Sequence, residues 1–134
     1  MTAYERTRRL ASHVKPCICS EKGSIVEPPS TTQFISAKEA VSKIPTGATI
    51  ALAGFVGCSC PEAIIDALRS RFDESSTPRE CTLVWGISSG DKKTRGYGKL
   101  AVEGLVKKCI YAWTASAPQF LPLIKENKIE VSSS

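Results

Sequence analysis

The chain has 134 residues, of which 42% are hydrophobic, a length and composition typical of one globular domain with its own core. Lys and Arg number 18 against 13 Asp and Glu, and the net charge of +5 without a long basic run argues against nucleic acid as the main partner. No segment approaches the roughly 20 consecutive apolar residues of a membrane-spanning helix, so we expect no membrane and favour an acidic small molecule as ligand.

Residues 1–35 differ in composition from the rest of the chain. They open with the Arg-rich stretch 6–9, contain several Ser and Thr, and reach the turn-forming Pro28 and Pro29. Such a segment resembles a mitochondrial transit peptide, and an untargeted tail fits the composition as well. We therefore expect a disordered or targeting extension, and a protein that is mitochondrial or cytoplasmic.

A short helix and a strand are predicted next. Ser36 and Glu39 have the spacing of a capping box, in which each side chain satisfies the backbone N–H of the other residue at a helix start. This helix should end before Pro45, where a turn leads into a strand over residues 48–53. Its apolar side chains and small neighbours suit a strand that is buried on both faces of a sheet.

A glycine-containing loop follows this strand. Gly54 and Gly57 allow the backbone to approach a ligand closely, and Pro61 suits the first turn of the next helix. Unpaired N–H groups at such a junction can bind a phosphate, a carboxylate or the oxyanion of a reacting carbonyl. We predict that backbone N–H groups near Phe55 face the ligand.

Strands and helices alternate through the remainder of the chain. The predicted elements are a helix opened by Pro61 and packed through Ile64, Ile65, Leu68 and Phe72, a strand over 81–86, a short helix around Leu100, Ala101 and Leu105, a strand over 108–113, a helix from Pro118 to Asn127, and a strand beginning at 129–131. Arg69 and Arg71 should point into solvent. This alternation predicts an α/β fold, an open parallel sheet with helical crossovers whose ligands gather at the carboxyl ends of the strands.

The loop after the second predicted strand is unusually long and rich in glycine and charge. Loops of this length inside a compact domain are usually functional, although a mobile, solvated loop is the open alternative. Its candidate ligand-contacting residues are Ser88 and Ser89, through their hydroxyls, and Lys92, Lys93 and Arg95, which could meet phosphates.

The six cysteines comprise two C-x-C pairs and two residues in apolar runs: Cys17 and Cys19, Cys58 and Cys60, and Cys81 and Cys109. Structural zinc sites favour wider spacings and the only histidine is His13, so we predict no metal and free thiols in a reducing compartment. A thiol at a helix N-terminus, at Cys58 or Cys60, would have a lowered pKa. Without a histidine base in residues 36–134, a cysteine hydrolase is disfavoured.

An ordered series of motifs resembles the amino-terminal half of family I CoA-transferases of the acetate and propionate type. The motifs are Ser36-Ala37-Lys38-Glu39-Ala40, Ile50-Ala51-Leu52-Ala53-Gly54-Phe55, Pro61-Glu62-Ala63, Gly90-Asp91-Lys92 and Glu103-Gly104-Leu105-Val106-Lys107. The resemblance extends from about Ser36 to Val131. It implies an incomplete amino-terminal CoA-transferase domain over residues 36–134, with coenzyme A as a substrate and no resident cofactor.

The resemblance also implies where the chemistry lies. Enzymes of this family move CoA between carboxylates through a glutamyl-CoA thioester, and their nucleophilic glutamate belongs to the carboxy-terminal half, beyond the part that Ser134 would match. This chain therefore supplies no catalytic residue, and neither Glu62 nor Glu103 inherits that role. Expected partners are acyl-CoA, a carboxylate, and a carboxy-terminal half or further copies of the chain.

What the resemblance assigns to this chain is a wall of the substrate pocket. The residues concerned are Gly54, Phe55 and Gly57 in the loop for CoA and the acyl group, and Ser88, Ser89, Gly90, Asp91 and Lys92 in the loop near the reacting carbonyl. Relatives usually have glycine where Ala53 and Ser59 stand, and an oxyanion-stabilising glutamine where Ser89 stands. A serine hydroxyl is too short to replace that amide, and one such donor contributes about 3 kcal/mol to barrier lowering.

We compare three candidate functions for this chain. The favoured one is a truncated CoA-transferase that lacks the catalytic glutamate, is inactive alone and belongs to short-chain fatty acid or ketone body metabolism. The second is a non-catalytic alpha-type subunit or acyl-CoA-binding module that needs a partner chain. The third, an unrelated nucleotide binder, is disfavoured because the chain lacks G-x-G-x-x-G and G-K-[ST] motifs. An incomplete sheet would also leave exposed edges and make the chain poorly soluble or dependent on another chain.

Overall fold

The computed structural model describes residues 34–133, so the predicted extension lies outside the described residues except for Phe34 and Ile35. Within this described part, no helix has the length and apolar character needed to cross a membrane.

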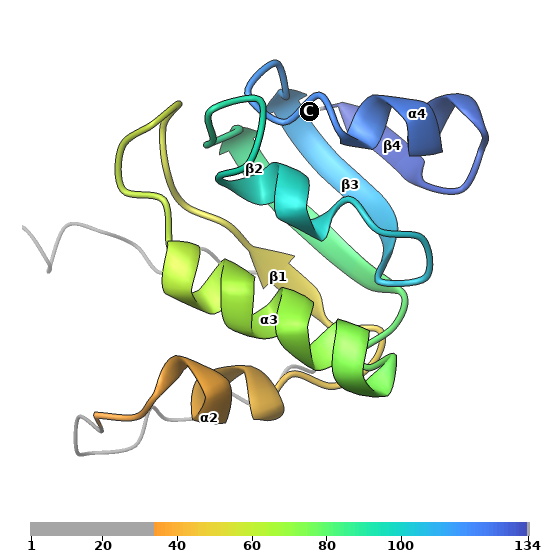
Figure 1. Ribbon diagram of the computed structural model, residues 1–134. Coiled ribbons are helices and arrows are strands. Elements are labelled where there is room, and N and C mark those ends of the chain that lie inside the picture. The colour runs from red at the N-terminus through yellow and green to blue at the C-terminus, as the bar shows by residue number, and fades with distance from the viewer. Residues whose placement is uncertain (1–33, 134) are drawn as a thin grey trace, which may run out of the picture. The chain divides into compact units, whose positions relative to one another are not determined.

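A four-stranded parallel sheet organises this part of the chain (Figure 1). In the order β1-β2-β3-β4 its strands are β1 (Thr49–Ala51), β2 (Cys81–Ile87), β3 (Val106–Trp113) and β4 (Glu130–Ser133). Every neighbouring pair is parallel. The predicted α/β fold with an open parallel sheet is confirmed, because each strand returns through a helical connection.

The helices agree with the sequence prediction in number and place but differ in extent. They are α2 (Ala37–Ser42), α3 (Glu62–Ser75), the 3-10 helix η1 (Tyr97–Leu100) and α4 (Phe120–Lys125). Ser36 caps α2, since its Oγ accepts the Glu39 N–H at 3.1 Å. The predicted helix reaching Leu105 is wrong, because η1 ends at Leu100 and Gly104 turns the chain with φ +85°.

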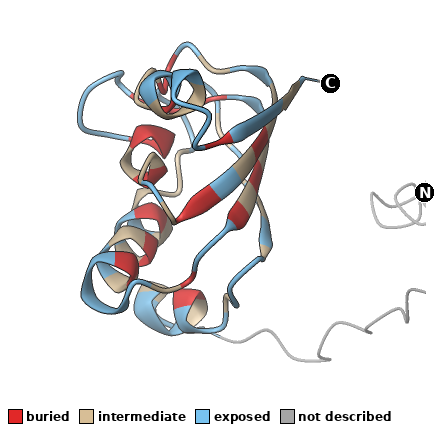
Figure 2. Ribbon diagram, turned by 90° about the vertical axis from the view of Figure 1, so that its right-hand side faces the viewer, coloured by how far each residue is buried: buried red, intermediate tan, exposed pale blue. Residues whose placement is uncertain are grey.

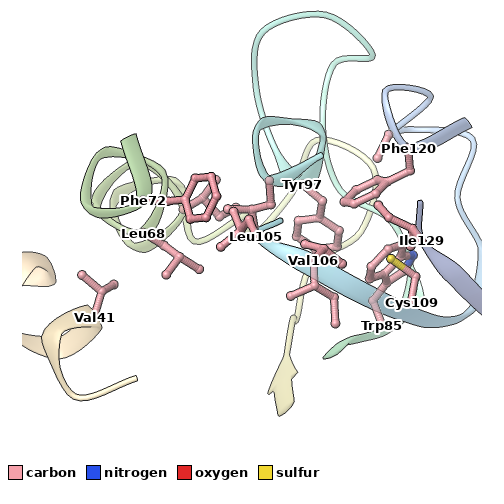
Figure 3. Packing of buried hydrophobic residues seen from close by; sticks show 14 residues of the cluster. Val41, Leu68, Phe72, Trp85, Tyr97, Leu105, Val106, Cys109, Phe120 and Ile129 are labelled. Atoms are coloured by element: carbon pink, nitrogen blue, oxygen red, sulfur yellow. The ribbon is translucent and has the colours of Figure 1, made fainter. Parts of the chain in front are cut away.

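The described helices α3, η1 and α4 cover one face of the sheet (Figure 2). Along β2 the residues Cys81, Leu83 and Trp85 are buried on that face, while their neighbours are only partly covered. Trp85 lies in the core there, with its ring centroid 5.7 Å from that of Tyr97 and 5.4 Å from that of Phe120 (Figure 3). It also stacks on Tyr111, with ring centroids 5.1 Å apart. The sheet and these helices therefore share one apolar core.

No described element covers the opposite face of the sheet (Figure 2). Ala51, Val84, Ile110 and Ser132 form one row across this face, and each is either exposed or half-buried. The prediction that the first strand is buried on both faces is therefore wrong. The reason is that no described element covers this face of the sheet, so β1 has a cover on one side only.

Arg71 also departs from expectation. Its Nη1 donates to the carbonyl oxygens of Val41 and, at 2.9 Å, of Ile44, so the guanidinium joins α3 to the C-terminal end of α2. Arg69 pairs with Asp73 at 2.8 Å, and its Nη1 donates to the Lys99 carbonyl oxygen at 3.0 Å. The prediction of solvated side chains is therefore wrong for both arginines, because carbonyls at the ends of neighbouring helices need donors.

Candidate functional site

The loops that follow β1 and β2 meet at the carboxyl edge of the sheet and bind each other through Val56. The Val56 carbonyl accepts hydrogen bonds from the Ser89 hydroxyl at 2.9 Å and from the Gly90 N–H. The Val56 N–H donates to the Ser88 carbonyl at 3.3 Å. A third loop joins them after β3, because the Ser116 N–H donates to the Ser88 hydroxyl at 3.0 Å. The predicted site residues are thus brought together.

Gly54 and Gly57 play different parts in this junction. Gly54 has φ +154°, and a Cβ there would lie 2.9 Å from the Ser89 Cβ and 3.1 Å from the Tyr97 hydroxyl oxygen. The close approach that Gly54 permits is therefore to the second loop. A Cβ at Gly57 would meet nothing within 4 Å, so the space beside Gly57 is open.

The backbone N–H groups of the first loop are largely used within the protein. Phe55 and Cys58 exchange hydrogen bonds, with the Phe55 N–H 3.0 Å from the Cys58 carbonyl and the Cys58 N–H 2.8 Å from the Phe55 carbonyl. The prediction of ligand-facing N–H groups is therefore wrong for Phe55, Val56 and Cys58, because a tight turn pairs the first and last of these with each other and the Val56 N–H donates to the second loop. The Phe55 side chain is 58% exposed and is the part of this residue that a ligand could contact.

The second loop holds the other predicted residues in a fixed turn. Ser88 and Ser89 are fully buried with their hydroxyls engaged between loops, so they position the site, and their contact with a substrate stays a prediction. Asp91 accepts the N–H groups of Lys93, Thr94 and Arg95 at 2.8 to 2.9 Å. These bonds, first that of Arg95 and then that of Lys93, hold the pKa of the Asp91 carboxyl well below its usual range.

Gly90 and Lys92 also belong to this turn. A Cβ at Gly90, where φ is +153°, would lie 2.5 Å from the Arg95 carbonyl oxygen, so the turn has no room for a side chain there. Lys92 has φ +67° and is exposed, which leaves its ammonium group accessible to solvent and to ligands.

A small cavity of about 100 Å³ opens between the two loops and the start of α3. It is lined by Val56, Gly57, Cys60, Glu62, Gly90, Asp91 and Arg95. Three of these were predicted as site residues from the motifs, whereas Cys60 and Glu62 were assigned no binding role. Cys60 and Glu62 follow shortly after Gly57 at the start of α3, and this closeness in sequence to a predicted site residue could have identified them.

Glu62 is the centre of an ion-pair network at the cavity wall. Its Oε2 lies 2.8 Å from Lys99 Nζ, which is also 2.5 Å from Asp66, and these two carboxylates raise the pKa of the Lys99 ammonium group, Asp66 more strongly. Arg95 Nε lies 3.7 Å from Glu62 Oε1, and the Arg95 side chain is 65% exposed. An exposed pair of this kind contributes at most about 1 kcal/mol.

The thiol at the cavity floor is not activated. Burial raises the pKa of the Cys60 thiol, and the Glu62 carboxylate beside it acts in the same direction. The prediction of a lowered thiol pKa is wrong for Cys60, because desolvation outweighs the helix N-terminus. The cysteines of the described part are free thiols, and residues 34–133 contain no cluster of His, Cys, Asp and Glu that could hold a metal ion.

Comparison with known proteins assigns the family. Residues 34–134 match the family model described as Coenzyme A transferase. The chain is 37% identical over 97 residues to caffeate CoA-transferase of Acetobacterium woodii, and 35% identical over 109 residues to acetate CoA-transferase YdiF of Escherichia coli K12. These alignments cover 72% and 78% of this chain, but only 18% and 20% of the relatives.

Solved structures give the same result. The YdiF apoenzyme from Escherichia coli O157:H7 superposes with a TM-score of 0.73 and 31% identity over 81% of this chain and 22% of that one. The thioester complex of the same enzyme with CoA gives a TM-score of 0.68 over 75% of this chain and 20% of that one. The chain belongs to the CoA-transferase family, and it spans about a fifth of the length of the curated relatives it matches.

Proposed function

We propose that this chain forms part of the substrate pocket of an enzyme that moves CoA between an acyl-CoA and a short-chain carboxylic acid. The observation that carries the proposal is the family match over residues 34–134, which includes both loops around the cavity. A solved relative is a thioester complex with CoA, which supports CoA as the ligand here. Short-chain fatty acid or ketone body metabolism is the setting we propose.

In this proposal the nucleophilic glutamate comes from a segment outside the matched fifth of the relatives. The residues around the cavity position the substrates, and the chain is inactive alone. The carboxylates of the described site support this view, because Glu62 is paired with Lys99 and Asp91 caps its own turn. A separate partner chain and a longer form of this chain would supply the glutamate equally well.

The test is titration calorimetry of the whole chain with CoA, NAD and ATP. We expect saturable binding of CoA and none of NAD or ATP at the same concentration. In the variant Gly57→Leu a side chain enters open space beside the cavity, so CoA affinity should fall at least tenfold while the fold is kept. Gly86→Leu is the matched control, since a Cβ there also meets nothing within 4 Å and Gly86 does not line the cavity.

Reconstitution tests the catalytic part of the proposal. Mixing the chain with a carboxy-terminal half of a CoA-transferase should restore CoA transfer from acetyl-CoA to propionate, and neither part should be active alone. Co-purification of a separate glutamate-bearing chain from the source would favour the alpha-type subunit. Absence of CoA binding together with absence of reconstituted activity would contradict the proposed function.

A further inference from the structure

Arg95 lines the cavity, with its backbone held by the turn and its side chain exposed. Its N–H donates to Asp91 Oδ1 at 2.9 Å, and its carbonyl packs against Gly90. The side chain lines the cavity and is 65% exposed. The loop therefore fixes the backbone of Arg95, while the guanidinium at the end of its side chain stays accessible to a ligand.

The other charged groups that line the cavity are Asp91 and Glu62. Asp91 accepts three backbone N–H groups of its own turn, and Glu62 Oε2 accepts a hydrogen bond from Lys99 at 2.8 Å, while Glu62 Oε1 is buried without a hydrogen bond. Arg95 Nε is 3.7 Å from Glu62 Oε1, too far for a hydrogen bond, and the guanidinium has no other ion pair within residues 34–133. Its planar N–H donors are thus available to a carboxylate, which they can bind through two parallel hydrogen bonds.

The rest of the cavity suits a short hydrocarbon chain. Val56, Gly57 and the Cys60 thiol contribute apolar or weakly polar surface beside the guanidinium. The volume of about 100 Å³ equals roughly three waters' share of liquid volume. The Arg95 guanidinium offers a small aliphatic carboxylate a charged partner beside this apolar surface, with Glu62 and Asp91 lining the same cavity.

We propose that Arg95 binds the carboxylate group of the small acid substrate and is a specificity-determining residue of this site. The inference rests on the proposed function, because it assumes that this cavity belongs to the CoA-transferase pocket. On ligand binding Arg95 exchanges its long contact with Glu62 for two hydrogen bonds to the acid. Glu62 keeps its bond to Lys99 during this exchange.

The test is an NMR titration of the whole chain with propionate, following the backbone amides and the Arg95 Nε–Hε signal. Arg95→Gln removes the charge and the forked donor, and should weaken propionate binding at least tenfold. Arg95→Lys keeps the charge alone and should recover only part of the affinity. Lys125→Gln is the control, because it makes the same change of charge at an exposed position of α4 that does not line the cavity.

Equal weakening by Arg95→Gln and Lys125→Gln would overturn the proposal, since it would show general electrostatic attraction. Saturable CoA binding without any propionate binding would also overturn the role of Arg95, while leaving the proposed function intact. Arg95-dependent propionate binding without CoA binding would keep this carboxylate site and contradict the proposed function. Failure to bind either ligand would contradict both.

Discussion

Cys109 is a buried thiol whose ionisation should be visible in the stability of the protein. It has no exposed surface, and burial raises the pKa of its thiol from 9.0 to about 12. The raised pKa means that the folded state keeps a proton that the unfolded state loses. The contribution to stability is therefore complete below pH 9.0 and is lost as the pH rises toward about 12.

We predict that the free energy of unfolding falls more steeply above pH 9.0 in the wild-type protein than in Cys109→Ala. The difference in slope should reach up to about 1.4 kcal/mol per pH unit. Urea denaturation at a series of pH values on both sides of pH 9.0 measures it. Cys58→Ala is the control, because Cys58 is exposed, and identical slopes for all three proteins would contradict the prediction.

At the level of single residues, the sequence indicated which residues lie together better than it indicated what each of them contacts. Gly54, Ser89 and Gly90 were expected around the pocket, and the structure brings them together. Their packing onto one another could not be predicted, because a glycine that admits a ligand and one that admits a neighbouring loop have the same local signal. For the same reason Arg71 was expected in solvent, although its carbonyl partners lie 27 and 30 residues away in sequence.

At the level of elements, Arg71 is the main polar link between α2 and α3. Hydrogen bonds from a charged donor contribute roughly 1.5 to 3 kcal/mol when partly buried. We predict that Arg71→Met destabilises the protein by about 1 to 3 kcal/mol and speeds hydrogen exchange in α2. Urea denaturation and amide exchange of Ala40 and Val41 measure the two effects. As a control, Lys125→Met at an exposed position of α4 should change the free energy of unfolding by less than about 0.5 kcal/mol.

An Arg71→Met protein with unchanged stability would show that α2 is held by apolar packing alone. Val41 contributes to this apolar packing, since it is buried against Leu68 in the same core (Figure 3). Unchanged exchange in α2 would have the same meaning, because the guanidinium bonds lie at its last turn.

The elements themselves were largely predictable because their signals are local. The capping serine predicted α2 within two residues, and Pro61 predicted the start of α3 within one. β1 is shorter than predicted, at Thr49–Ala51, although the Ala48 carbonyl and the Leu52 N–H still bond to β2. The extent of η1 was missed since a 3-10 turn has no apolar period of its own.

For the whole molecule, the sheet with one uncovered face is the feature that the sequence did not reveal. Strands of parallel sheets are normally buried on both faces, and Val84 and Ile110 are apolar enough for that setting. The apolar pattern of a strand predicts burial on both faces of the sheet, but it does not show whether an element that covers each face is present. In the described part of the chain no element covers this face, and reliance on another protein chain stays a prediction.

This asymmetry gives a prediction that compares two adjacent residues of β2. Leu83 faces the helices and is 1% exposed, whereas Val84 faces the open side and is half-buried. Leu83→Ala should cost about 2 to 5 kcal/mol of unfolding free energy through the lost contacts and the cavity left behind. Val84→Ala should cost less than about 1 kcal/mol, because little covers its side chain.

Urea denaturation of both variants measures the contrast, and Leu83→Val provides a milder change if Leu83→Ala does not fold. A Val84→Ala cost as large as that of Leu83→Ala would show that the open face is covered in solution by another part of the chain or by a second copy. Dilution separates these two cases, because only the cover from a second copy is lost at low concentration. Adding a complementing carboxy-terminal half tests a third source of cover. A cover supplied by that half makes Val84→Ala costly only in the mixture, since the side chain becomes buried only there.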